Sequence, residues 1–219
     1  QRMRSLLGTD FEAFLAGYAR PLSRGLRVNT LKISVERFRA LFPLPLATVP
    51  FSPDGFAVPP DFKAGADPLH HAGAYYMQEP SAMSAVTVLA PQPGERVLDL
   101  CAAPGGKSTQ IAAALGGSGL LWSNEYVRSR AQVLLQNLER CGVTNAVVSS
   151  TDVHTLAEGL PGWFDAVLVD APCSGLGVIA DKPDVKYRLN DEELDGLPDI
   201  QKSILDACAK CVRPGGRLV

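Results

Sequence analysis

From residue 96 onward, short apolar runs alternate with longer amphipathic segments. The apolar runs predict strands at Arg96–Leu100, Gly119–Asn124, Ala146–Ser149, Ala166–Val169 and from Arg217. The segments between them predict helices at Ser108–Leu115, Ser129–Cys141 and Asp199–Val212. Strands that alternate with helices form a parallel sheet with right-handed crossovers. The pattern therefore predicts an α/β domain whose ligands bind beyond the carboxyl ends of its strands.

The first 68 residues follow a different pattern. They predict a helix over Ser5–Tyr18, a strand over Gly25–Ile33, a helix over Val35–Leu41 that Ser34 caps, and a hairpin over Thr48–Val58. The hairpin is expected to turn at Pro53-Asp54-Gly55, because these residue types favour turns. We therefore expect a small α+β module at 1–68, a helical connector at 69–92 and the α/β domain at 93–219.

A glycine-containing loop follows the first predicted strand of the α/β domain. The loop residues are Cys101, Ala102, Ala103, Pro104, Gly105, Gly106 and Lys107. Glycines let the backbone approach a ligand closely, and the first N–H groups of the following helix point toward it. This strand, loop and helix therefore predict a cradle for a nucleotide-like ligand.

Two kinds of ligand compete for that cradle. Gly106-Lys107-Ser108 looks like the end of a phosphate-binding P-loop, but Cys101 stands where that motif requires glycine. Pro104 also lacks the N–H that a phosphate would use. A loop with few phosphate donors suits a ligand without phosphates, such as S-adenosylmethionine (SAM). A βα turn that binds no ligand is the remaining alternative.

Acidic residues follow three successive predicted strands. Glu125 lies about 20 positions beyond the glycine loop, where a carboxylate accepts hydrogen bonds from ribose hydroxyls. Asp152 follows the third strand, and Asp170 follows the fourth. Because parallel strands end at one edge of the sheet, we expect these three carboxylates to surround one ligand.

The segment Asp170–Gly175 reads Asp-Ala-Pro-Cys-Ser-Gly. A thiol at Cys173, at the rim of a cofactor site, suggests a nucleophile or its partner. Cytosine offers a use for such a thiol, because its carbon 5 is too weak a nucleophile to attack a methyl sulfonium directly. A thiolate that adds to carbon 6 activates carbon 5, and a carboxyl group such as Asp170 can hydrogen-bond the ring nitrogens.

Composition excludes several classes of protein. The chain of 219 residues is 46% hydrophobic and 20% charged, as in an ordinary globular protein, and no apolar run approaches membrane-spanning length. Its five scattered cysteines indicate a reducing compartment, and we expect a cytoplasmic protein. Cys208 and Cys211 lie in a predicted helix without a second pair of ligands, so we read them as buried helix residues and expect no metal site.

Charge is distributed unevenly along the chain. The net charge is −2, but residues 1–40 hold eight basic and three acidic side chains, which leaves a net charge of −7 on the remainder. A basic N-terminal region on an acidic chain is typical of an electrostatic footprint for nucleic acid. A solvated basic face explains the same charge pattern equally well.

The two motifs together resemble a known family. Asp-Leu-Cys-Ala-Ala-Pro-Gly-Gly-Lys-Ser-Thr at 99–109 and Asp-Ala-Pro-Cys-Ser-Gly at 170–175 resemble the bacterial RNA cytosine-5 methyltransferases of the Sun/Fmu and nucleolar-protein family. The resemblance also covers 25–30, 75–83, Asn124-Glu125 and Lys182-Pro183-Asp184.

This resemblance implies a Rossmann-like SAM-dependent methyltransferase fold behind a small RNA-recognition-like module. It implies that residues 101–107, Glu125, Asp152 and Asp170 bind SAM or line its pocket. It implies RNA, most often ribosomal, as the partner, with the target cytosine drawn out of its stack. We expect no membrane association, and a monomer.

In that family the attacking cysteine lies in a Thr-Cys motif just after the next strand, whereas the cysteine that corresponds to Cys173 assists turnover and product release. The nucleophile is therefore expected beyond Val219, together with the last strands of the sheet. We expect Cys173 and Asp170 to be the catalytic residues within these 219 positions, and the 219 residues alone to bind SAM without turnover by the family mechanism.

Other functions remain open at this point. One is a SAM- and RNA-binding protein without catalysis. A transfer-RNA cytosine-5 methyltransferase fits the same motifs. A DNA methyltransferase would use the Pro-Cys thiol itself as nucleophile, but it fits the N-terminal module and the Cys-Ala-Ala-Pro-Gly-Gly-Lys run less well. The P-loop hydrolase is disfavoured by Cys101.

Overall fold

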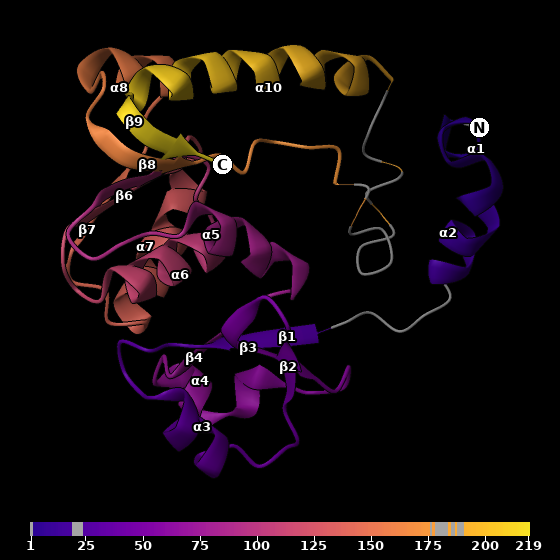
Figure 1. Cartoon of the computed structure of the whole chain (residues 1–219), viewed down its shortest axis with the longest axis vertical. Helices are drawn as coiled ribbons and strands as arrows, with labels where there is room; N and C mark the ends of the chain where they lie inside the picture. The colour runs from indigo at the N-terminus through magenta and orange to yellow at the C-terminus, as the bar shows by residue number, and fades with distance from the viewer. Residues whose placement is uncertain (1, 19–23, 176, 178–183, 185–186, 188–190) are drawn as a thin grey trace.

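The computed structural model describes the chain except for residues 1, 19–23, 176, 178–183, 185–186 and 188–190 (Figure 1). Lys182 and Pro183, which belong to the family resemblance, lie outside the described residues. The remaining chain forms two separate sheets, one of four strands and one of five. No helix in the described part is long and apolar enough to cross a membrane.

The second sheet is the predicted parallel α/β sheet. Its strands are β5 (Arg96–Asp99), β6 (Leu120–Asn124), β7 (Ala146–Ser149), β8 (Phe164–Leu168) and β9 (Val212–Leu218), in the spatial order β7-β6-β5-β8-β9. All four neighbouring pairs are parallel. β9 begins at Val212 rather than at the predicted Arg217, with a register irregularity against β8.

Helices cover both faces of this sheet. α5 (Ser84–Leu89), α6 (Gly106–Leu115) and α7 (Arg128–Arg140) pack on one face, and α8 (Val153–Gly159) and α10 (Asp191–Cys211) pack on the other (Figure 1). Cys208 and Cys211 are fully buried in the second core, which confirms their interpretation as buried helix residues. α10 begins well before the predicted Asp199 because the helix continues through Pro198.

The first sheet forms the N-terminal module. Its antiparallel strands are β1 (Arg24–Val28), β2 (Ala47–Val49), β3 (Ser52–Val58) and β4 (Tyr75–Met77), in the order β2-β3-β1-β4. α3 (Val35–Leu41) packs its buried Phe38 against this sheet, and Ser34 caps the helix as predicted by accepting from the Arg37 N–H. The short helix α4 (Pro68–His71) completes the module, and the helices α1 (Arg2–Leu7) and α2 (Phe11–Gly17) precede it in the chain.

Several local predictions for this module are wrong. The hairpin turns between Val49 and Ser52, so Pro53-Asp54-Gly55 lies inside β3. Gly55 is needed there for close packing, because a Cβ at this position would come within 2.5 Å of the Met83 sulfur. Residues 75–77, which were expected in the connector, form β4 because they pair with β1.

Two further boundaries differ from the prediction. β1 ends at Val28 because the Asn29 side chain accepts from the Leu31 N–H and starts a turn. The helix predicted over Ser5–Tyr18 is divided by a 3-10 turn at Gly8–Asp10, where Gly8 adopts a φ of +51°.

The module contacts the C-terminal end of α7. Asn29 Nδ2 donates to the Gly73 carbonyl at 2.8 Å and to the Cys141 carbonyl at 2.7 Å. Lys32 Nζ donates to the carbonyls of Ala72 and Arg140, both at 2.7 Å. The last carbonyls of a helix lack partners within the helix, so donors from the module satisfy them and join the two sheets.

Candidate functional site

A cavity of about 850 Å³ opens beyond the carboxyl ends of the parallel strands. Its lining includes the sequence-predicted residues Cys101, Ala103, Glu125, Asp152, Asp170 and Cys173. α10 closes the opposite wall with Asp199, Ile200, Ser203 and Ile204. The sheet therefore brings the three strand-end carboxylates to one cavity, as the sequence pattern predicts.

A second cavity of about 190 Å³ lies between the glycine loop and β4. Its lining holds the remaining loop residues except Gly105, namely Ala102, Pro104, Gly106 and Lys107, and it shares Cys101, Ala103 and Asp170 with the larger cavity. Tyr76, Met77 and Gln78 complete its wall from the module. Both sheets therefore contribute to the surroundings of the loop.

The glycine loop is held in one conformation by packing and hydrogen bonds. Gly105 adopts a φ of +113° directly before α6, and a Cβ there would lie 3.2 Å from a methyl carbon of Leu134. Asn137 Nδ2 donates to the Pro104 carbonyl at 2.9 Å, and the Arg130 guanidinium donates to the Ala103 carbonyl at 3.1 Å. The Ala103-Pro104 peptide is cis. α7 therefore fixes one side of the loop.

Glu125 is almost fully buried, although it carries a carboxylate. One carboxylate oxygen accepts from the Val127 N–H at 3.0 Å, and the Arg130 guanidinium lies 3.5 Å from the other. These partners keep Glu125 at the end of β6 and leave it in the wall of the larger cavity.

Asp152 caps α8, a helix that the sequence pattern did not predict. Its carboxylate accepts from the N–H groups of His154 at 2.8 Å and Thr155 at 3.4 Å. His154 in turn contacts the Ser203 hydroxyl at 3.0 Å, which joins α8 to α10 beside the cavity. Asp152 is therefore both a helix cap and a part of the cavity wall.

Asp170 and Lys107 form an ion pair between the ends of two elements. Lys107 Nζ lies 2.7 Å from Asp170 Oδ2, and both residues line the smaller cavity. The Asp-Ala-Pro-Cys segment that follows is held by Gln201 of α10, which donates to the Pro172 carbonyl at 2.8 Å. Asp170 therefore lies next to the glycine loop, as the sequence pattern predicts.

Cys173 differs from the other four cysteines. It is exposed, whereas Cys141, Cys208 and Cys211 are buried and Cys101 is half-buried. Burial raises the pKa of Cys101 and of Cys208 to about 12, so both thiols stay protonated near neutral pH. Of the two thiols that line the larger cavity, Cys101 and Cys173, Cys173 is the exposed one.

Asp99 is a site residue that the sequence reasoning did not select. It is fully buried at the end of β5 and lines the smaller cavity. The Ser108 hydroxyl donates to its Oδ2 at 2.6 Å, but its Oδ1 has no hydrogen-bond partner among the residues that the structure describes. Burial raises the pKa of Asp99 to about 6. In the sequence, Asp99 stands two residues before the glycine loop, inside an apolar strand, where no pattern marks it as a ligand.

The two cavities fit SAM. This molecule carries an adenine, a ribose, a cationic sulfonium and an amino-acid group. Glu125 is available to the ribose, and the unpaired oxygen of Asp99 suits a cationic group.

Among the residues that the structure describes, no group of three or more His, Cys, Asp or Glu side chains could hold a metal ion.

A parallel sheet with helices on both faces, and a glycine loop with acids at successive strand ends, define a Rossmann-like SAM-dependent methyltransferase. Residues 86–219 match the family described as 16S rRNA methyltransferase RsmB/F, and residues 1–80 match the N-terminal domain of 16S rRNA methyltransferase RsmF. The chain belongs to the RsmB/F family of 16S rRNA methyltransferases, which are SAM-dependent enzymes.

Curated relatives agree with this assignment. The chain is 41% identical to ribosomal RNA small subunit methyltransferase F of Enterobacter sp. (strain 638) and of Klebsiella pneumoniae (strain 342). Each alignment covers 96% of this chain and 46% of the relative, so the chain spans about half the length of these proteins.

Solved structures confirm the fold over nearly the whole chain. PH0851 superposes with a TM-score of 0.91 at 28% identity, covering 99% of this chain and 50% of that one. A methyltransferase homologue from Pyrococcus horikoshii superposes with a TM-score of 0.85 at 30% identity, covering 99% of this chain and 70% of that one. The predicted Rossmann-like fold and the predicted family are therefore confirmed.

The raised pKa of Asp99 predicts a pH-dependent stability difference. The folded pKa of about 6 exceeds the ordinary value of 3.8, so the folded state binds the proton more tightly than the unfolded chain. Relative to an Asp99→Asn variant, the wild type should therefore lose up to about 3 kcal/mol of unfolding free energy as the pH rises from 4 to 7. Urea unfolding at a series of pH values measures this difference. Parallel pH profiles for the two proteins would contradict the prediction.

Proposed function

We propose that the protein that carries these residues transfers a methyl group from SAM to carbon 5 of a cytosine in small-subunit ribosomal RNA. The observation that carries this proposal is the convergence of Glu125, Asp152 and Asp170 on one cavity, with Cys173 at its wall. The relatives named small subunit methyltransferase F support the RNA substrate.

SAM is assigned to the two cavities on either side of the glycine loop. Glu125 accepts hydrogen bonds from the ribose hydroxyls, and Asp152 lines the part of the larger cavity that takes the adenosine. Asp99 and Lys107 bind the amino-acid end through opposite charges, because one is acidic and the other is basic. Residues 101–107 supply the backbone surface against which the cofactor packs.

The chemistry needs an activated cytosine. SAM supplies the electrophilic methyl group. Asp170 hydrogen-bonds the nitrogen edge of the base and holds carbon 5 toward that methyl group. A cysteine thiolate adds to carbon 6, forming a carbon–sulfur bond, and the ring electron pair that this moves onto carbon 5 bonds the methyl group. The bond between that methyl group and the sulfonium sulfur breaks in the same step, and the sulfur keeps the electron pair as a neutral thioether. A base then takes the carbon 5 proton, and the electrons of that bond restore the ring double bond as the carbon–sulfur bond breaks and releases the thiolate.

We assign this last elimination to Cys173 and the attack on carbon 6 to a different cysteine, as the family resemblance implies. The exposure of Cys173 favours a second candidate, in which its own thiol attacks carbon 6. The buried cysteines at 141, 208 and 211 are poor candidates for the attack because neither RNA nor solvent reaches them.

The N-terminal module is assigned to RNA binding, together with β4, which completes its sheet. The exposed basic residues Arg37 and Arg39 lie on α3, away from the ion pairs of the parallel sheet. Phosphate contacts from such side chains are independent of sequence and weaken as salt rises. The parallel-sheet domain is assigned to catalysis.

The SAM assignment makes Glu125 a binding residue. Glu125→Gln removes the charged acceptor and should raise the SAM dissociation constant by about 10- to 100-fold. This factor corresponds to the usual free energy of a hydrogen bond to a charged group. Isothermal titration with SAM measures the dissociation constant. Glu139→Gln on the exposed side of α7 makes the same chemical change and should leave SAM affinity unchanged. Equal SAM affinities for the wild type and Glu125→Gln would refute the ribose assignment.

The role of Cys173 can be read from covalent protein–RNA adducts. In the protein that carries these residues together with the attacking cysteine, and with SAM and small-subunit ribosomal RNA, Cys173→Ser should slow turnover by about 100-fold and accumulate RNA-linked protein on a denaturing gel. Digestion of RNA treated with the wild type should yield 5-methylcytidine. Cys141→Ser, which changes a buried thiol, should neither slow turnover nor accumulate RNA-linked protein.

Two results would overturn these roles. If Cys173→Ser forms no adduct and transfers no methyl group while the wild type does both, Cys173 is the attacking nucleophile. If wild-type RNA product contains a methylated nucleoside other than 5-methylcytidine, the cytosine mechanism is wrong.

A further inference from the structure

Arg27 is a basic residue that points inward. It lies on β1 in the basic N-terminal region, yet its side chain is only 1% exposed. It is therefore unavailable to an RNA phosphate. Burying a guanidinium removes it from water at a large cost in free energy, so this charge must be held by partners inside the protein.

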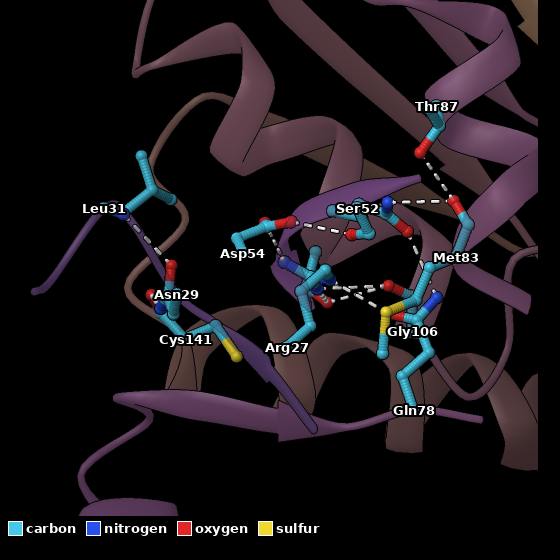
Figure 2. A network of polar contacts seen from close by, with 12 residues as sticks. Arg27, Asn29, Leu31, Ser52, Asp54, Gln78, Met83, Thr87, Gly106 and Cys141 are labelled. Atoms are coloured by element: carbon cyan, nitrogen blue, oxygen red, sulfur yellow. Dashed lines mark hydrogen bonds and ion pairs between the residues drawn. The ribbon is translucent and has the colours of Figure 1, made fainter. Parts of the chain in front are cut away.

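The partners of Arg27 come from the N-terminal module and from α6 (Figure 2). Its Nε donates to Gln78 Oε1 at 2.9 Å, next to β4. Its Nη2 donates to Thr109 Oγ1 at 2.7 Å and to the Gly106 carbonyl at 3.3 Å, both on the first turn of α6. The carboxylate of Asp54 on β3 lies 4.0 Å from Nη1.

These contacts reach the element that begins where the glycine loop ends. Gly106 is the first residue of α6, and it lines the smaller cavity. Thr109 Oγ1 also donates back to the Gly106 carbonyl at 3.0 Å, so Arg27 holds two oxygens that are already linked. One guanidinium therefore fixes the first turn of α6 relative to the module.

The placement of this charge is not explained by helix stability. The N-terminal end of a helix carries a partial positive charge, and a cation beside it is electrostatically unfavourable. Within the part of the chain that the structure describes, Arg27 pairs with one carboxylate, that of Asp54 on β3, on the module side of the contact. What the contact provides is a fixed position of α6 relative to the module. The guanidinium of Arg27 is planar and makes three hydrogen bonds, so it sets the directions in which its acceptors lie.

A second set of hydrogen bonds runs beside the first. Gln78 Nε2 donates to Gln110 Oε1 at 3.2 Å, and Gln110 Nε2 donates to the Met83 carbonyl at 3.0 Å. Tyr76 adds a longer contact at 3.4 Å from its hydroxyl to the Pro104 carbonyl in the loop itself. The module therefore contacts both α6 and the glycine loop, where Tyr76 shares the Pro104 carbonyl with Asn137 of α7.

We propose that Arg27 is a positioning residue of the SAM site, which makes cofactor affinity depend on the N-terminal module. Arg27 touches no part of either cavity; it acts through Gly106 and Thr109, which set the start of α6 and the end of the loop. This inference rests on the proposed SAM site at residues 101–107.

The test compares SAM dissociation constants with thermal stability. Arg27→Met keeps the length of the side chain but removes its donors, and it should weaken SAM binding by about tenfold or more, within the usual range of coupling between two sites. Arg27→Lys keeps the charge and one direction of donation, so it should recover part of the affinity. Isothermal titration gives the dissociation constant, and calorimetry gives the Tm.

Asn29→Ala is the matched control. Asn29 follows the same strand, is also buried and also contacts a helix of the parallel-sheet domain, but that contact is at the end of α7 rather than at α6. Its variant should lower the Tm and leave the SAM dissociation constant within about twofold of the wild type. If Asn29→Ala weakens SAM binding as much as Arg27→Met at an equal loss of Tm, Arg27 acts only through general stability and the proposal is wrong.

Two further variants keep the outcomes separate. If Arg27→Met does not unfold cooperatively, Thr109→Val carries the test, because it removes the acceptor at 2.7 Å and keeps the shape of the side chain. It should weaken SAM binding by about three- to tenfold, and unchanged affinity would overturn the proposal.

If Glu125→Gln leaves SAM affinity unchanged, the proposed SAM site itself fails. If Glu125→Gln weakens binding and the Arg27 and Thr109 variants do not, only the positioning role fails.

Discussion

Parallel pairing of β5 with both β6 and β8 is the constraint on which the site depends. Each strand of a parallel sheet ends at the same edge, so residues far apart in sequence meet there. This alignment places Asp99, Glu125 and Asp170 around the glycine loop, although they come from three different strands. An antiparallel partner at either position would send one of these carboxylates to the opposite edge.

The N-terminal module acts on this arrangement from outside the sheet. Asn29 and Lys32 contact the end of α7, whereas Arg27 contacts the beginning of α6. These two helices flank the glycine loop, because α6 follows it directly and Asn137 of α7 hydrogen-bonds it. The run Arg-Val-Asn-Thr-Leu-Lys at 27–32 therefore joins the module to both helices, and the loop lies between them.

Much of the parallel domain could be predicted because its strands are buried on both faces. Such strands read as continuous apolar runs, and the residues that follow them mark the site. Glu125 and Asp170 were found in this way. Asp99 was not, because an acid inside an apolar strand has no periodicity to distinguish it, and only its unpaired oxygen in the folded protein shows its relevance.

The module was harder to predict because its elements are short and depend on contacts distant in sequence. β4 has three residues and exists because it pairs with β1 about 50 positions earlier. Gly55 looked like a turn residue, but its role is to admit the Met83 side chain. Arg27 contributed to a basic region that suggested RNA contact, and only the fold shows that its charge is buried.

Hydrogen exchange of the backbone amides, measured by mass spectrometry with and without SAM, tests the central claim most directly. If SAM lies beyond the carboxyl ends of the strands, exchange should slow in the segments 101–107, 124–127 and 152–154. It should stay unchanged in β2 and α3 of the module. Protection confined to the module, or binding of SAM without protection of the glycine loop, would contradict the account.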